Sequence, residues 1–194
     1  MASRREFIRT GIGALGGISF LHGGCVRTSN KPNESTPPAS SLFATKGDIR
    51  ITNVNLQFER EPLLRPFGFK GGYLSELWQV ISFLESDSGQ HAIGLGTQSV
   101  LWSDGTVFAT SSEAGGNAYM LALTEHALKL LKNCSFSSPM DLIEPLYEEV
   151  FEYGKTIASN PALRETFALN ALVSVDNALW LLYAKERGIT NFDD

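Results

Sequence analysis

The chain has 194 residues, of which 43% are hydrophobic and 19% charged, a composition typical of one globular domain. Its formal net charge is −5; three arginines and one glutamate give the segment through Cys25 a charge of +2, which leaves −7 for residues 26–194. This acidic balance excludes nucleic acid as an expected partner. Two cysteines and three scattered histidines predict neither a disulfide framework nor a zinc cluster.

Residues 1–25 are predicted to be an export signal. Gly11, Gly13 and Gly16 have the G-x-G-x-x-G spacing of dinucleotide-binding turns, but the charged residues before them cannot form the buried strand that this motif requires. A basic start followed by an uncharged run over residues 10–21 is instead typical of a targeting segment. The run is too short to span a bilayer, which takes about 20 residues.

The sequence SRREFIR resembles the twin-arginine export signal through Arg4 and Arg5. LHGGC resembles a bacterial lipobox, in which Cys25 would be lipidated, although the usual leucine position is taken by His22. Residues 26–47 are rich in Ser, Thr, Asn and Pro, and predict a disordered linker, which fits both a lipoprotein tether and a spacer after a cleaved signal. We therefore expect twin-arginine export to a periplasmic or membrane-anchored location.

Short extended runs after residue 47 predict three antiparallel strands. Residues 48–60 alternate between apolar and polar side chains, with a slip near Asn53 that predicts a β-bulge. Residues 77–86 and 91–100 form two further runs, joined by an Asp-Ser-Gly sequence suited to a tight hairpin.

Beyond the strands, the apolar period changes from two to about 3.6, which predicts helices. The first covers residues 117–133, and Cys134 near its end is expected to be a small buried thiol. The second begins with Ser138 as its cap and Pro139 in its first turn, and Pro145 should break or kink it.

A third helix is predicted over residues 161–187, ending before Gly188. Its second half is apolar nearly all round, so we expect it to lie between two layers. Three strands followed by three helices predict the α+β fold class, as an antiparallel meander followed by a helical bundle.

The last predicted helix lies within ALVSVDNALWLLYAKERGI, residues 171–189, which contains Asp176, Ala178 to Trp180, Lys185 and Gly188. Together with PLLRPFGF at 62–69, SGQHAIGLG at 88–96 and the order of elements, it resembles the enolase superfamily, in the mandelate racemase and muconate lactonizing enzyme branch. Leu181 and Thr97 stand where acidic residues are common in that family. The resemblance covers residues 48–194, and implies that residues 48–187 are an enolase-like N-terminal capping domain whose helix 161–187 leads into a TIM barrel.

The resemblance implies proton abstraction next to the carboxylate of a small substrate, with Mg²⁺ stabilising the enediolate, as in racemases, epimerases, cycloisomerases and dehydratases. In relatives the bases and the metal ligands lie on barrel strands. Nine residues follow Lys185, whereas a barrel takes about 250. We therefore interpret residues 188–194 as a truncated barrel start and expect the TIM barrel to be absent from this chain. No catalytic or metal-binding residue is assigned, and the chain alone is expected to bind no Mg²⁺ and to be inactive.

The resemblance also implies a substrate lid built from two loops, residues 61–72 and 101–116. The candidate lid residues are Arg65, Phe67, Phe69, Lys70, Trp102 and Asp104. Arg65 or Lys70 would meet a substrate anion, although an exposed solubilising charge explains either residue equally well. Phe67 and Phe69 also fit a role in packing beneath the lid.

The alternative function is a non-catalytic, exported or lipid-tethered binding module. Such a module would hide the apolar side of the last helix, with Leu179, Trp180 and Leu182, in a homo-oligomer or against a partner, whereas in an enzyme that side would dock on the barrel. A membrane contact is expected only through the lipid anchor. A small hydrolase is not supported, because the sequence contains no nucleophile elbow.

Overall fold

The computed structural model describes residues 47–191. The predictions for the export signal with Arg4 and Arg5, for lipidation of Cys25 and for nearly all of the linker lie outside the described residues.

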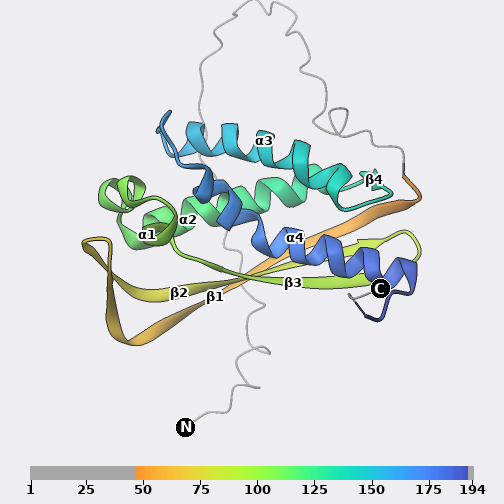
Figure 1. Cartoon of the computed structure of the whole chain (residues 1–194), viewed down its shortest axis with the longest axis horizontal. Helices are drawn as coiled ribbons and strands as arrows, with labels where there is room; N and C mark the ends of the chain where they lie inside the picture. Colours follow the sequence, from red (N-terminus) through yellow and green to blue (C-terminus); the bar gives the residue numbers. More distant parts are fainter. Residues whose placement is uncertain (1–46, 192–194) are drawn as a thin grey trace, which may run out of the picture. The chain divides into compact units, whose positions relative to one another are not determined.

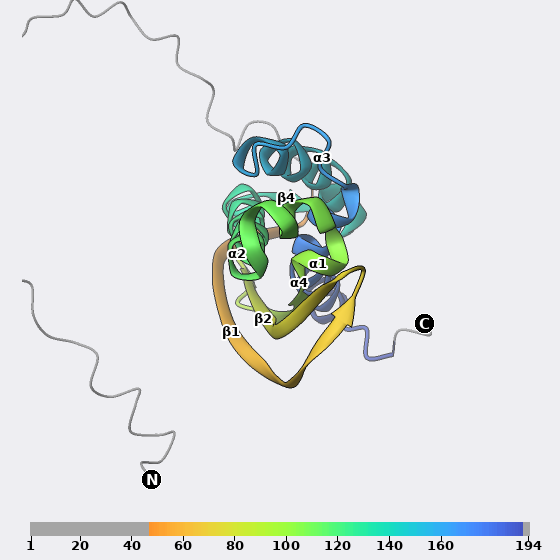
Figure 2. The ribbon, with the colours of Figure 1, turned by 90° about the vertical axis from the view of Figure 1, so that its left-hand side faces the viewer.

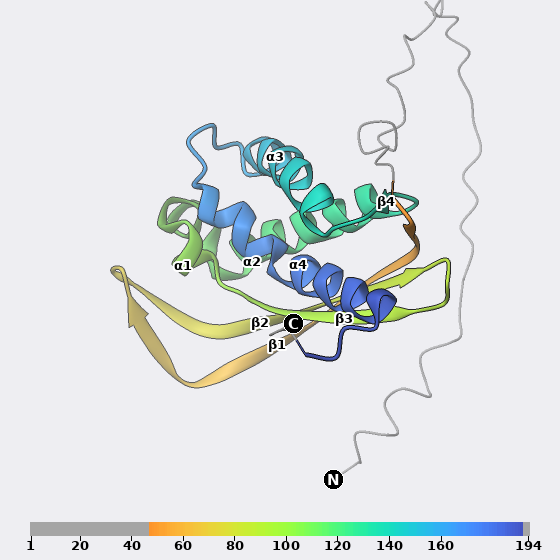
Figure 3. The same cartoon turned by 45° about the vertical axis from the view of Figure 1, so that its right-hand side comes forward.

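The domain is an antiparallel sheet with helices on one of its faces (Figures 1 and 3). The strands are β1 (Ile49–Phe69), β2 (Gly72–Ser86), β3 (His91–Gln98) and the short β4 (Ser135–Phe136), in the sheet order β3-β2-β1-β4. The helices are α1 (Val100–Ser103), α2 (Gly105–Leu131), α3 (Met140–Ile157) and α4 (Glu165–Arg187). The predicted α+β class and the antiparallel meander are confirmed, with β4 as a strand that the sequence pattern did not indicate.

The predicted bulge near Asn53 is confirmed. The register between β1 and β2 shifts between Ile51 and Asn53. At this point the backbone of Ile51 bonds to the segment that follows α2: its N–H donates to the Cys134 carbonyl (2.9 Å) and its carbonyl accepts from Asn133 N–H (2.8 Å). The bulge therefore lets the start of β1 join the segment that follows α2.

Residues 61–72 are not a loop, contrary to the prediction. The pairing of β1 with β2 continues to Phe69 and Gly72, so the two strands form one long hairpin. A register shift between Pro62 and Phe67 accommodates the proline-containing stretch, because proline cannot donate to a strand ladder. The turn residues Lys70 and Gly71 have positive φ (49° and 81°), as a two-residue type I′ turn requires.

Residues 101–116 are also not a loop: they form most of α1 and the first part of α2. A kink at Ser112, where φ is 66°, divides α2. Gly116 lies where α2 touches α1, and a Cβ on it would be 2.3 Å from Val100 Cγ2. This glycine therefore serves close helix packing, a role that a single sequence does not distinguish from a flexible point.

Helix α3 continues through Pro145, contrary to the predicted break. The proline removes one hydrogen-bond donor near the start of the helix, a loss that the remaining turns tolerate. The predicted cap by Ser138 is wrong, because no side-chain hydrogen bond caps the start of α3; instead, Asp141 Oδ2 accepts from the N–H groups of Ser137 (3.1 Å) and Ser138 (2.8 Å), which precede the helix.

Helix α4 begins at Glu165, four residues after the predicted Pro161, and ends before Gly188 as predicted. Gly188 has φ 66°, and the N–H of Ile189 bonds to the carbonyl of Ala184 (2.8 Å), which is a Schellman end. By length and composition α4 is apolar enough to cross a membrane, but 56% of its most apolar window is buried inside the domain.

The core lies between the sheet and the helices. Its largest wholly buried side chains include Phe136, Leu123, Leu142, Phe167 and Leu179. Cys134 is buried, as predicted, and burial raises the pKa of its thiol, so it is protonated and unreactive at neutral pH.

Helix α4 lies directly on β3, because two glycines of β3 remove the side chains that would separate them. A Cβ on Gly94 would be 1.9 Å from the Ser174 carbonyl oxygen. Three side chains of α4 also donate to β3 carbonyls: Asn170 to Thr97 (3.0 Å), Asn177 to Leu95 (2.8 Å) and Lys185 to His91 (2.6 Å). The edge of β3 is thereby covered.

Candidate functional site at the hairpin tip

The two segments predicted to form a lid meet at one end of the domain. We call this region the hairpin tip: residues 63–74 of β1 and β2, together with Trp102 of α1. Figure 2 shows the hairpin and α1 from that end, and Figures 1 and 3 show α1 beside its turn. Gly72 fixes their approach, because a Cβ there would be 2.9 Å from the Phe108 ring.

An aromatic row connects the two segments. The Phe69 ring stacks on Trp102, with centroids 4.9 Å apart, and Phe67 continues the row at 6.4 Å from Phe69. Trp102 is 60% exposed and Phe67 57%, so the row is a surface feature. The predicted alternative, in which Phe67 packs beneath the lid, is therefore wrong for that residue.

The two predicted cations have different surroundings. Lys70 Nζ donates to the Trp102 carbonyl (3.2 Å) and lies 5.2 Å from the Phe69 ring centroid, so it helps to fasten the turn to α1. Arg65 is exposed and makes no hydrogen bond or ion pair within residues 47–191. It borders an apolar groove of about 580 Å³ lined by Leu63, Leu64, Phe67, Leu74 and Leu77. Arg65 is thus the better placed of the two to meet an anion.

Asp104 is not available at the tip, contrary to its assignment as a lid residue. Its side chain is buried and caps α2, with Oδ1 accepting from Thr106 N–H (2.8 Å) and Val107 N–H (3.1 Å). Oδ2 accepts from Arg164 N–H (3.0 Å), just before α4. Both carboxylate oxygens therefore hold the helices together.

Glu113 fastens the hairpin to α2, and the sequence analysis missed it. Its carboxylate accepts from the N–H of Ser75 (2.9 Å), from the Ser75 hydroxyl and from the N–H of Glu76 (3.3 Å). A glutamate in a polar, glycine-rich stretch gives no sequence signal for such a role. The role of Glu113 is apparent only in the structure, where the kink at Ser112 brings Glu113 to β2.

A second network stiffens the hairpin nearer the sheet. Arg60 forms a two-pronged ion pair with Glu76 (2.8 and 2.9 Å), and Trp78 Nε1–H donates to the same carboxylate (2.8 Å). The Arg60 hydrogen bonds lower the pKa of the Glu76 carboxyl. Phe58 stacks on Trp78 with a centroid separation of 5.0 Å.

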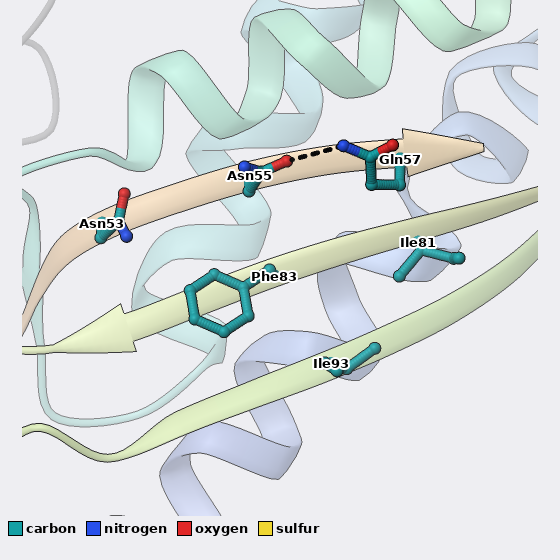
Figure 4. A pocket seen from close by; sticks show the side chains of 6 residues that line it. All are labelled: Asn53, Asn55, Gln57, Ile81, Phe83 and Ile93. Carbon is teal, nitrogen blue, oxygen red and sulfur yellow. Dashed lines mark hydrogen bonds between the residues drawn. The ribbon is translucent and has the colours of Figure 1, made fainter. Parts of the chain in front are cut away.

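The sheet face away from the helices carries a second surface of interest. A shallow hollow of about 360 Å³ lies over Asn53, Asn55, Gln57, Ile81, Phe83 and Ile93. Figure 4 shows the three amides in a row along β1 and the apolar side chains on β2 and β3. Gln57 Nε2 donates to Asn55 Oδ1 at 3.4 Å.

The exposed side of α4 differs from the prediction. Leu179 and Leu182 are wholly buried within this domain, because they face the core and not the solvent. Trp180 is 37% exposed and lies beside Leu181 and the outward side chains of β3. Lys185 Nζ donates to the His91 carbonyl, and burial raises the pKa of Asp176.

The described residues do not offer a metal site of their own. Between residues 47 and 191, no group of three His, Cys, Asp or Glu side chains is placed to hold a metal ion. The donor set that Mg²⁺ prefers, several converging carboxylates, is therefore not assembled in this part of the chain.

No family model and no curated protein matches the chain. Solved structures do, and three are representative. The L-talarate/galactarate dehydratase from Salmonella typhimurium LT2 is 17% identical, with 88% of this chain and 35% of that chain covered and a TM-score of 0.45. The dipeptide epimerase from Enterococcus faecalis V583, complexed with Mg and L-Leu-L-Tyr, is 17% identical, with 71% and 32% covered and a TM-score of 0.45.

A mandelate racemase/muconate lactonizing enzyme from Polaromonas sp. JS666 is 21% identical, with 72% of this chain and 31% of that chain covered and a TM-score of 0.46. The chain spans about a third of the length of these solved proteins.

Proposed function

We propose that residues 48–187 are the N-terminal capping domain of a larger Mg²⁺-dependent enolase-superfamily enzyme, a racemase, epimerase, cycloisomerase or dehydratase. The proposal rests on the sequence motifs around Asp176 and Gly188. The observation that carries it is the meeting of the two predicted lid segments at the hairpin tip, through the Phe69–Trp102 stack. In this proposal the hairpin tip covers a small carboxylate substrate held by a barrel, and the 194-residue chain alone is inactive.

The proposed role of the tip follows from its chemistry. Phe67 and Trp102 offer exposed apolar surface that excludes water when the tip closes, and Arg65 offers a cation without a protein partner among the described residues. The metal would be held outside residues 47–191, so no catalytic step is assigned to these residues.

The test is α-proton exchange with D₂O, followed by NMR on a panel of small carboxylic acids with and without Mg²⁺. The 194-residue chain is expected to give no exchange, whereas a chain extended along its own reading frame is expected to exchange the proton of its substrate only with Mg²⁺. A reading frame that does not continue into a barrel would refute the enzymatic proposal.

In the extended chain, Trp102→Ala is expected to raise KM more than it lowers kcat, because the tip acts by holding the substrate. Met140→Ala is the matched control, since Met140 is a comparably exposed apolar residue on α3. Equal KM and kcat values for the two variants would contradict the proposed lid role of Trp102.

Export by the twin-arginine route and lipidation at Cys25 form the second part of the proposal. Changing Arg4 and Arg5 together to lysine is expected to retain the protein in the cytoplasm, and Cys25→Ala is expected to abolish labelling with a fatty-acid analogue. Unchanged fractionation of the lysine variant would argue against this route.

The alternative, a non-catalytic binding module tethered outside the cytoplasm, is favoured by the uncharged apolar surface over β3 and α4. Retention of a natural partner by the 194-residue chain, in the absence of any proton exchange, would support it over the enzyme.

A further inference from the structure

One residue of α2 has a backbone conformation that residues with side chains rarely adopt. Ser112 has φ 66° and ψ 171°, whereas the residues on either side of it are helical. This combination of φ and ψ is nearly exclusive to glycine, and other residues held in it cluster at clamps and switches. Strain of this kind weakens the state that contains it by roughly 5- to 150-fold. The surrounding contacts must therefore enforce the conformation of Ser112.

The neighbouring Glu113 supplies these contacts. Its carboxylate accepts from the N–H of Ser75 (2.9 Å), from the Ser75 hydroxyl and from the N–H of Glu76 (3.3 Å). The Ser112 hydroxyl accepts from Gly115 N–H (3.3 Å), and so caps the second part of α2. If Ser112 returned to helical φ and ψ, the two parts of α2 would become continuous and the Glu113 carboxylate would leave β2.

The Glu113 contacts lie at a break in the long hairpin. The register of β1 with β2 shifts between Pro62 and Phe67, and Ser75 lies opposite this gap. Figures 2 and 3 show β1 bending sharply shortly before the turn. Where the strand ladder is interrupted, Glu113 accepts the Ser75 N–H. We therefore interpret the gap as a hinge that the Glu113 carboxylate stiffens.

Beyond this hinge the tip has other attachments of its own. The Phe69 ring stacks on Trp102, and Lys70 Nζ donates to the Trp102 carbonyl (3.2 Å). Leu74, only 6% exposed, packs beneath the turn. Release of Glu113 would therefore loosen the hairpin tip without detaching it from the domain.

We propose that Ser112 and Glu113 form a strained latch on this hinge, which opens when Ser112 relaxes to helical φ and ψ and closes when Glu113 returns to Ser75. The hydrogen bonds keep the latch closed most of the time, and the strain keeps its opening within reach of thermal motion. As a control on access to a substrate, the latch rests on the proposed function. It is tested without substrate on the 194-residue chain, so its failure is distinguishable from failure of the proposed enzyme.

The test is hydrogen exchange of the Ser75 and Glu76 amides, followed by NMR, because these N–H groups donate to Glu113 directly. Ser112→Gly removes the strain of the closed latch and disfavours the continuous helix of the open one. It is expected to slow both exchange rates at least about fivefold. The lost Ser112 hydroxyl offsets little of this, because glycine is nearly as good as serine at the start of a helix.

Ser111→Gly is the matched control, since Ser111 is helical with the latch closed and would remain helical with it open. It is expected to change neither rate by more than about twofold. Glu113→Ala is expected to speed both rates at least about tenfold, and to abolish the effect of Ser112→Gly when the two are combined. In the wild type both amides should exchange faster than that of Val80, which is wholly buried in the middle of β2, as a local opening requires.

Circular dichroism on each variant establishes that it is folded. Slower exchange of the two amides in Ser112→Gly, but not in Ser111→Gly or in the combination with Glu113→Ala, supports the latch. Unchanged or faster exchange in Ser112→Gly, or an equal slowing in Ser111→Gly, would overturn it. Wild-type amides of Ser75 and Glu76 that exchange no faster than that of Val80 would also overturn it.

Discussion

Replacing Gly94 by alanine is expected to destabilise the domain by about 3 kcal/mol. The added Cβ would lie 1.9 Å from the Ser174 carbonyl oxygen and 2.4 Å from the Ala178 nitrogen, both of which are backbone atoms of α4. Since real Cβ atoms stay at least 3.0 Å from such neighbours, the helix itself must move.

The magnitude follows from what that movement disturbs. Overpacking a tight contact typically costs about 1–3 kcal/mol. The shift also pulls Ser174 away from Ser82, whose hydroxyls form a buried hydrogen bond of 2.8 Å, worth about 1 kcal/mol. The sum is a large part of the roughly 5–15 kcal/mol by which a typical protein is stable.

The assay is urea unfolding followed by circular dichroism, on three alanine variants. Gly96→Ala should cost less than Gly94→Ala, because its Cβ would lie 2.9 Å from the Ser174 nitrogen, so a small shift relieves it. Gly105→Ala is the control: nothing lies within 4 Å of its added Cβ, and alanine favours the helix that Gly105 begins. A Gly94→Ala chain as stable as the Gly105→Ala chain would refute the direct packing of α4 on β3.

Three further outcomes are expected. Glu113→Gln should lower the free energy of unfolding by about 1–2 kcal/mol and speed amide exchange in β2. The control Glu125→Gln breaks an exposed ion pair and should change the free energy of unfolding by less than about 0.5 kcal/mol. Similar amide exchange in both variants would contradict the role of Glu113 in fastening the hairpin to α2. Asp104→Ala should cost about 2 kcal/mol in a thermal or urea melt. Asp104→Asn should cost less, because the asparagine keeps one cap acceptor and loses only the acceptor for Arg164 N–H; equal losses would contradict capping. Burial lowers the pKa of His126, which stacks on Tyr153 at 4.1 Å, so the unfolded chain binds the proton more tightly. Stability should be complete above about pH 6.5 and fall as the pH drops below it, and His126→Phe should flatten this part of a pH series of unfolding curves; an unchanged slope would exclude His126 as its source.

The sequence predicted those features that depend on local pattern. The slip of alternation at Asn53 became the bulge, Gly188 ended α4, and Cys134 is buried near a helix end. Each follows from a few neighbouring residues whose chemistry favours one backbone shape.

Features that depend on distant partners were not predictable in this way. The resemblance predicted a loop over residues 101–116, but these residues are mostly helical, and Gly116 is needed because Val100 lies against it. The resemblance predicted a loop over residues 61–72, but an irregular register after Pro62 lets the hairpin continue past it. The sequence around Asp104 did not indicate that its second carboxylate oxygen would accept a hydrogen bond from the N–H of Arg164, sixty residues later.

For the candidate site, sequence reasoning found the right segments but not their secondary structure. Phe69, Lys70 and Trp102 do come together, although a strand turn and a helix present them instead of two loops. Glu113 was missed, since two of its three donors are backbone N–H groups, which every sequence has.

The three α4 side chains that bond to β3 make the sheet closed to growth on that side. On the other side β4 pairs only with Ile49 and Arg50, so most of β1 has an unpaired outer edge. That edge is interrupted by prolines and charges, which discourage a stray strand from adding to it, whereas β3 has only α4 as protection. A chain that is cut or unfolded before α4 would expose β3 as an unpaired, hydrophobic edge strand. Proteolysis between α3 and α4 would therefore convert a folded domain into a species that promotes aggregation.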